Sequence, residues 1–325
     1  MTGQRILHQI EFRWQPDKDF SAIASSFDGQ ELNRAWSARI TGPGRPATPD
    51  PRSGVPERSV AYLNFPAGMA ALVWRHYQRD ARPLYRQAAR QPLVARALIG
   101  ESSWLTAGLA MAMCHVDYVG RLSPPAGQVE PDARLEPIDS SGLVDALQPQ
   151  ARILDSLARH EQGLMSLVAT ALRHPGSPLS IVLPGAELAG PPESSAAVPL
   201  LWGLWRTTAP LLVPGGLTSP RGWSFSSYEP PLGNSRTGGL PAIVFRSQEQ
   251  ERRDLPPLSY RAEVTVRPRD PVRDDDHAGL VAQALTAAYR AVPAGKIWRH
   301  LKRTAVRWPE LSDRLKAIER DFRVR

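Results

Sequence analysis

The sequence holds very little cysteine. Cys114 is the only cysteine among 325 residues, so the chain cannot form an internal disulfide. Structural disulfides belong to oxidising compartments, and their absence leads us to expect a cytoplasmic location. The first residues, MTGQRILHQIEFRW, lack the basic stretch and apolar run of a signal peptide. The most apolar stretches, residues 105–113 and 198–213, fall short of the roughly 20 apolar residues that a span needs, so we expect no membrane insertion.

Motifs for catalysis, metal binding and nucleotide binding are also missing. The seven histidines are scattered and form neither an H-x-x-x-H nor an HExxH pattern, so we expect no zinc site. The glycine-rich stretches lack the GxxxxGK[ST] and GxGxxG patterns, which leaves nucleotide binding without support. No serine lies in a GxSxG setting. We therefore expect no cofactor and favour a non-enzymatic protein, while a catalytic triad assembled from distant residues stays open because it needs no local motif.

Two clusters of reactive side chains have structural explanations. Cys114 and His115 are neighbours in sequence, whereas a nucleophile and its base come from separated parts of a fold. At the end of an apolar helix, Cys114 is expected to be a small buried hydrophobe. Asp270 and the run at residues 274–276 precede a predicted helix, and three adjacent aspartates do not alternate as calcium ligands do. Capping of the helix by these carboxylates is the interpretation that we favour.

Lysine is scarce although the chain is basic. Arginine outnumbers lysine 36 to 4, and the net charge is +8. Residues 296–325 carry a net +6 and residues 71–100 a net +5, so the remainder is close to −3. Binding of nucleic acid by these two basic segments is the alternative function that we keep. The abundance of arginine, alanine, proline and glycine also follows from GC-rich codons, and this weakens the alternative.

The tryptophans allow two interpretations. Trp202, Trp205 and Trp223 lie close together in sequence and could form a recognition surface, since tryptophan is enriched in binding hot spots. The other interpretation is that they are core aromatics, and we favour it because each tryptophan buries a large area. Trp298 and Trp308 lie in the basic C-terminal segment and are expected to be partly exposed.

Hydrophobic patterning predicts an α+β (mixed α/β) protein. The 32 prolines are about twice the usual share of roughly 5%, and they should confine regular structure to short elements. We expect a β-rich N-terminal part over residues 1–122, an α/β part over residues 138–270 and a helical C-terminal part over residues 274–325. The proline-rich stretch at residues 122–137 is the expected boundary between the first two.

The expected elements follow from the period of the apolar residues. Residues 8–14 alternate between apolar and polar side chains, which predicts a half-buried strand. Residues 70–77 fit a strand or a helix, and residues 41–58 fit an exposed loop. The other expected strands are residues 22–27, 35–40, 59–65, 94–99, 179–183, 223–228, 241–246 and 260–267. The expected helices are residues 104–113, capped by Ser102 or Ser103, a block over 143–172, and 198–212, 279–292, 296–306 and 309–322.

A set of short segments resembles a known group of proteins. The segments are ILHQIEF, YLNFP, RALIG, PLSIVLPG, LLWGLWRT, RGWSFSSYEPPLG and LPAIVFR. Together they resemble uncharacterised actinobacterial proteins encoded beside small GTPases, and more loosely the GTPase-associated proteins of bacterial conflict systems. The likeness covers about residues 4–250 and carries over no catalytic residue. It implies an accessory or adaptor role beside a GTPase.

The expected function is therefore that of a non-enzymatic adaptor or scaffold in a multi-protein conflict or signalling system, with a protein partner such as a small GTPase. The candidate partner-binding residues are Trp298, Arg299, Lys302, Arg303, Arg307 and Trp308. Aromatic residues among arginines are typical of hot spots. An equally weighted interpretation is that the C-terminal helices cover one face of the sheet and their charges keep that face solvated. Truncation after Val292 separates the two interpretations: a folded core that no longer binds its partner indicates a docking tail, whereas unfolding makes the tail part of the core and contradicts docking.

Overall fold

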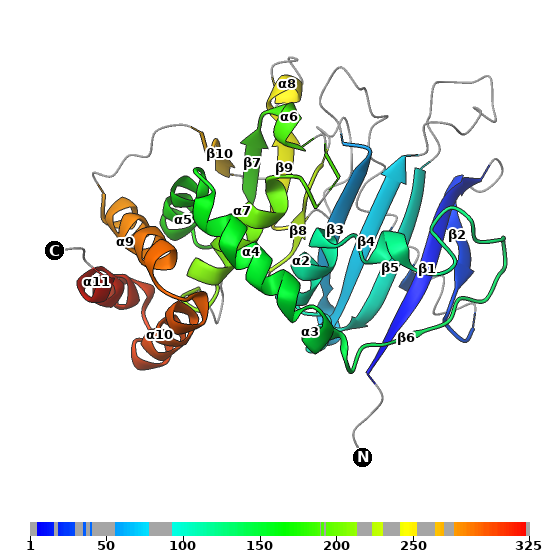
Figure 1. Ribbon diagram of the computed structural model, residues 1–325, viewed down its shortest axis with the longest axis horizontal. Helices are drawn as coiled ribbons and strands as arrows, with labels where there is room; N and C mark the ends of the chain where they lie inside the picture. Colours follow the sequence, from blue (N-terminus) through cyan, green and yellow to red (C-terminus); the bar gives the residue numbers. More distant parts are fainter. Residues whose placement is uncertain are drawn as a thin grey trace.

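The chain has a mixed α+β fold, with helices packed against one face of a long sheet (Figure 1). In Figure 1 the helices lie in front of the sheet, and the C-terminal helices close its left end. The computed structural model describes residues 5–15, 19–29, 35–36, 40, 56–77, 93–188, 190–191, 193–212, 223–229, 241–251, 264–269 and 276–322.

One sheet contains strands from both the N-terminal and the middle part of the chain. Its early strands are β1 (Ile6–Gln15), β2 (Asp19–Ser25), β3 (Arg58–Phe65), β4 (Met69–Tyr77) and β5 (Leu93–Glu101). Its later strands are β6 (Ile138–Asp139), β7 (Leu179–Leu183), β8 (Phe225–Ser226), β9 (Ile243–Ser247) and β10 (Val264–Val266). The order is β10-β7-β9-β8-β3-β4-β5-β1-β2, with β6 paired to β1.

The sheet changes from antiparallel to parallel at β8. This strand pairs antiparallel with β3 and parallel with β9, and β9, β7 and β10 continue in parallel. The strands expected in residues 1–122 and in residues 138–270 thus share one hydrogen-bonded sheet. The division of the chain into three parts stays a prediction.

The ambiguous segment at residues 70–77 forms strand β4. Leu72 and Trp74 face the helices, while Ala71 and Val73 face the opposite side of the sheet, so both faces of the strand are buried. The strand pairs with β3 along one edge and with β5 along the other. These two ladders and the packing on both faces outweigh the helix preference of the alanines.

The strand expected at residues 35–40 is wrong where the structure describes it. Residues 35, 36 and 40 are helical, and Trp36 and Ile40 are buried against the face of the sheet opposite the main helices. Both side chains pack with apolar strand residues of that face. Residues 41–55 of the expected loop and residues 260–263 of the last expected strand lie outside the described residues.

The prediction that β1 is half-buried is wrong on its polar face. Glu11 is 0% exposed, and its carboxylate pairs with the guanidinium of Arg96, also 0% exposed, directly across on β5. Glu11 also accepts hydrogen bonds from Arg13 Nε at 3.0 Å and from Arg13 Nη2 at 2.8 Å. One face of β1 is therefore apolar, and the other carries ionic side chains that are nevertheless buried.

The proline-rich connector at residues 122–137 covers that polar face (Figure 1). The backbone N–H of Gly127 donates to Glu11 Oε1 at 3.0 Å, and Gln9 Nε2 donates to the carbonyl of Glu136 at 2.6 Å. Polar atoms of β1 thus satisfy the backbone of a segment that has little hydrogen bonding of its own. The connector is a packed layer over the sheet.

The longer helices follow the predicted order, whereas the short helices at residues 185–188 and 248–251 were not predicted. The helices are α2 (Ala107–His115), α3 (Leu143–Ala146), α4 (Gln148–His160), α5 (Leu164–Arg173), α6 (Gly185–Leu188), α7 (Ala197–Thr208), α8 (Gln248–Glu251), α9 (His277–Ala291), α10 (Ala294–Arg307) and α11 (Leu311–Phe322). Two short 3₁₀ helices, η2 (Pro66–Gly68) and η3 (Val119–Arg121), complete the set. The cap of α2 differs from the expectation: Thr106, rather than Ser102 or Ser103, accepts from the N–H of Leu109 at 3.2 Å.

The helical block expected over residues 143–172 is broken into α3, α4 and α5. The break between α4 and α5 ends at Gly163, where a Cβ atom would lie only 2.3 Å from the Cβ of Pro268. Only glycine permits this close approach of the two chain segments. Apolar periodicity continues through the break, and for that reason the sequence pattern does not reveal it.

The helices share one hydrophobic core with the sheet. The last two helices contribute four large buried aliphatic side chains to it, Ile297 and Leu301 from α10 and Leu315 and Ile318 from α11. The last two helices are thus packed on the body of the protein, against α7 and α9.

Candidate partner-binding site

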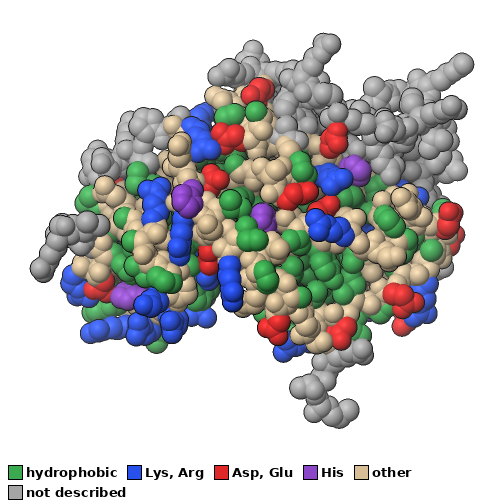
Figure 2. All heavy atoms as spheres, in the orientation of Figure 1, with side chains coloured by type: hydrophobic (Ala, Val, Ile, Leu, Met, Phe, Trp, Pro, Cys, Tyr) green, Lys and Arg blue, Asp and Glu red, His purple; other side chains and the backbone are tan. Residues whose placement is uncertain are grey.

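Helix α10 has one buried face and one basic face. Ile297, Leu301 and Thr304 are buried, as expected for side chains three and four residues apart on a helix. The opposite side carries five exposed cationic side chains, here called the basic face: Lys296, Arg299, Lys302, Arg303 and Arg307. Figure 2 shows Lys and Arg side chains gathered at the lower left of the molecule, over α10 and α11.

The carboxylates of α11 lie beside residues outside the basic face. Glu319 on α11 lies 3.1 Å from Nε2 of His277, and Asp321 lies 3.2 Å from Nε2 of His300. Asp313 is paired within α11. Within the described part of the chain, no carboxylate lies within ion-pair distance of the basic face. Its positive charge is therefore available to an outside partner.

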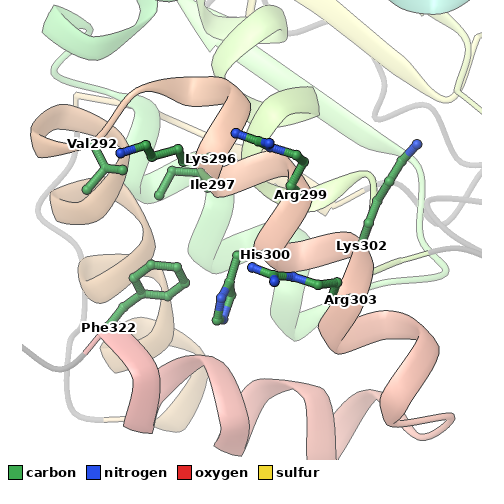
Figure 3. Close-up of a pocket in the computed structure, with 8 residues that line it drawn as sticks. All are labelled: Val292, Lys296, Ile297, Arg299, His300, Lys302, Arg303 and Phe322. Carbon is green, nitrogen blue, oxygen red and sulfur yellow. The ribbon is translucent and has the colours of Figure 1, made fainter.

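A groove borders the basic face (Figure 3). It has a volume of about 680 Å³ and lies between α10, the end of α9 and the end of α11. Its lining residues are Val292, Lys296, Ile297, Arg299, His300, Lys302, Arg303 and Phe322. The groove thus combines apolar walls with four of the five cations of the basic face.

The aromatic ring of Phe322 forms one wall of this groove. It contacts the His300 ring edge to face, with ring centroids 4.8 Å apart. Because His300 also lies beside Asp321, contacts within the protein hold both rings in place. The groove is a preformed feature of the packing of α10 on α11.

Trp298 lies at the border of the basic face, on the side of α7. Its ring packs on Trp205 with centroids 4.6 Å apart, and it is half-buried as the sequence predicts. Arg206 and Lys302 place their cationic groups 5.5 Å and 5.7 Å from the Trp298 ring centroid. Cation–π contact and packing on α7 thus hold this ring to the body of the protein.

Trp308 follows the last residue of α10 and is also half-buried, as predicted. The guanidinium of Arg307 lies 5.4 Å from its ring centroid. The six predicted residues therefore lie along one helix and its end, with the two tryptophans at opposite ends of the basic face. Val292, His300 and Phe322 were not predicted, because a groove between three helices leaves no mark in the pattern of any one of them.

The second basic segment, residues 71–100, loses charge to buried ion pairs. Arg75 pairs with Glu229 at 2.7 Å and Arg96 with Glu11, and all four side chains are at most 11% exposed. The four arginines at positions 79, 82, 86 and 90 lie outside the described residues. The described arginines of this segment thus give no support to phosphate binding.

Cys114 is buried in the core, as predicted. Burial, and to a smaller extent the charge of Asp117, raises the pKa of the Cys114 thiol. A thiol without thiolate character is a poor nucleophile.

We expect the folded protein to react with Ellman's reagent only as fast as it unfolds, and the urea-unfolded protein to react at once. Stoichiometric labelling of the folded protein within minutes would contradict this.

Asp276 behaves as the capping interpretation predicts. It accepts from the N–H of Gly279 at 2.6 Å at the start of α9, and from Arg173 Nη2 at 2.9 Å. Hydrogen bonding from Arg173, together with the N–H of Gly279, lowers the pKa of Asp276 to about 2. Residues 270–275 lie outside the described residues. The described part of the chain holds no cluster of three or more His, Cys, Asp or Glu that could bind a metal ion.

The tryptophans of the middle part favour the core interpretation. Trp202 is buried, and its indole Nε1 donates to Asp155 Oδ1 at 2.7 Å. Trp205 lies between Trp202 and Trp298, and Trp223 is half-buried against the same core. Trp202 therefore serves packing, and Trp205 supports the ring of Trp298.

No protein-family model matches the chain, and no curated protein matches it significantly.

In the ranges that the structure describes, no helix is both long enough and apolar enough to cross a bilayer.

Proposed function

We propose that this protein is a non-enzymatic adaptor that binds an acidic surface of a partner protein through the basic face of α10. The observation that carries the proposal is the set of five exposed cations on one side of a helix, none with a carboxylate partner in the described part of the chain. The other side of the same helix is buried in the core, so the charges are presented on a rigid support.

A protein partner fits this surface better than nucleic acid. The described arginines of residues 71–100 are consumed in buried ion pairs, so among the described residues of the two basic segments it is the C-terminal one, with α10, that presents a basic strip. A duplex is held by many phosphate contacts, and its affinity falls steeply with salt. The resemblance noted in the sequence points to a small GTPase as the partner and to a cytoplasmic adaptor role.

Reversal of two charges on the basic face should weaken partner binding without lowering the stability of the protein. Arg299→Glu/Arg303→Glu is expected to weaken partner binding by about tenfold or more, because each former attraction becomes a repulsion. Both side chains are exposed, so the thermal midpoint should stay close to that of the wild type. A matched control is Arg121→Glu/Arg152→Glu, which changes net charge equally at exposed positions away from α10.

The measurement has two stages. The tagged wild-type protein captures its partner from the native host, and the purified partner is then titrated against all three proteins by calorimetry at two salt concentrations. Equal affinity of the wild type and the α10 variant would refute the proposal. A tight, sequence-dependent gel shift with duplex DNA at physiological salt would favour the nucleic-acid alternative instead.

A further inference from the structure

Charge alone gives the proposed interface little affinity. Exposed ion pairs contribute about 0.2–1 kcal/mol each, whereas hot spots centre on a large side chain in a desolvated pocket. The groove beside the basic face offers apolar walls against which such a side chain could be buried. We propose that it binds one bulky apolar side chain of an acidic partner segment, with the basic face holding the carboxylates on either side. This inference rests on the proposed function and names the chemistry of its partner.

The walls of the groove suit an apolar side chain. Ile297 forms a buried floor, and the half-buried Val292 and Phe322 lie on facing helices (Figure 3). A volume of about 680 Å³ is larger than one side chain, so the groove also admits the adjoining backbone. The edge-to-face contact of Phe322 with His300 keeps the aromatic wall in place before binding, which reduces the entropic cost of ordering it.

The cations that line the groove determine which partner residues are favourable on either side of the apolar side chain. Lys296, Arg299, Lys302 and Arg303 all line it, and none is neutralised by a carboxylate of the described chain. Asp321, which lies 3.2 Å from Nε2 of His300 in this region, pairs with Arg320. A lysine or arginine of the partner would meet only like charge here, whereas carboxylates on both sides of the anchor meet cations about one helical turn, or 5.4 Å, apart.

Synthetic peptides test the anchor directly. The probes are a fluorescein-labelled peptide of Asp and Glu with one central Phe, the same peptide with Ser in place of Phe, and a labelled single-stranded oligonucleotide. The wild-type protein is expected to bind the Phe peptide about tenfold more tightly than the Ser peptide. Equal affinity for the two peptides, no binding of either, or tighter binding of the oligonucleotide would overturn the inference.

A variant with a filled groove should no longer distinguish the Phe peptide from the Ser peptide, but it should still bind both through the basic face. Val292→Trp places a large ring in the groove and is expected to bind both peptides with the weaker affinity of the Ser peptide. The control is Val306→Trp on α10, at a position that is 88% exposed and outside the groove; it should keep the tenfold difference. The comparison of the two peptides on the wild type needs neither variant to fold.

The outcome distinguishes the two proposals. If Arg299→Glu/Arg303→Glu weakens the native partner and both peptides while Phe and Ser bind equally, the anchor is refuted and the adaptor function stands. If the charge reversal has no effect on the native partner, the proposed function itself fails.

Discussion

A chain that ends at Val292 is expected not to fold cooperatively. It lacks α10 and α11, which bury Ile297, Leu301, Leu315 and Ile318 in the main core. At about 1.5–3 kcal/mol per buried aliphatic side chain, their loss removes about 6–12 kcal/mol. This matches the about 5–15 kcal/mol by which whole proteins are stable.

The loss of α11 has a second cost. Arg314 on this helix is buried, and its guanidinium donates to the carbonyls of Leu211 at 2.5 Å, Trp308 at 2.6 Å and Pro309 at 2.7 Å. Without the helix, the carbonyl of Leu211 at the end of the α7 segment loses its charged donor, which costs further stability.

Urea unfolding followed by circular dichroism and tryptophan fluorescence measures the effect. The control is a chain that ends at Phe322, the last residue of α11, and it should unfold at the wild-type midpoint. A sigmoidal transition at that midpoint for the chain ending at Val292 would show that the tail is separable from the core. Unfolding of this chain would contradict the separable docking tail expected as one interpretation of the sequence. Binding at the basic face of the folded protein is tested instead by Arg299→Glu/Arg303→Glu.

Replacement of Glu11 by alanine is expected to destabilise the protein by about 3–5 kcal/mol, the cost of leaving one partner of a buried ion pair alone. Arg96, with no exposed surface, would keep its charge and one hydrogen bond to the carbonyl of Pro124 at 2.7 Å. The N–H of Gly127 in the connector would lose its acceptor as well.

Two further variants separate charge from packing. Glu11→Leu/Arg96→Met removes both charges at similar volume and should recover much of the lost stability. Glu130→Ala, at an exposed position of the same connector, should stay within about 0.5 kcal/mol of the wild type. The free energy of unfolding comes from urea titration, and a loss below about 1 kcal/mol in Glu11→Ala would contradict a dominant role of the pair.

Elements with strong periodicity were predicted closely. The strand expected at residues 179–183 has the bounds of β7, and the helix expected at residues 296–306 lies within α10. Both have an uninterrupted pattern, a short apolar run in the first and one apolar stripe in the second. The cations of the candidate site were predicted for the same reason, since a charged arc opposite an apolar stripe stays in solvent.

Elements whose pattern depends on a distant partner were not predicted. Trp36 and Ile40 were assigned to a strand, yet both are helical residues buried against the far face of the sheet. The connector at residues 122–137 reads as a linker from its prolines, yet its backbone is bonded to polar atoms of β1. In both cases the local composition does not tell whether the segment is covered by the rest of the protein or exposed to solvent.

By itself the sequence determined that the chain forms no internal disulfide, mixes short strands with helices and carries a helix with one basic side. Only the tertiary structure decided that strands from both halves share one sheet, that Glu11 and Arg96 are buried together, and that Val292, His300 and Phe322 form a groove beside the basic face. The physical reason is that periodicity reports which side chains share a side of an element. What covers that side depends on contacts between residues far apart in the chain.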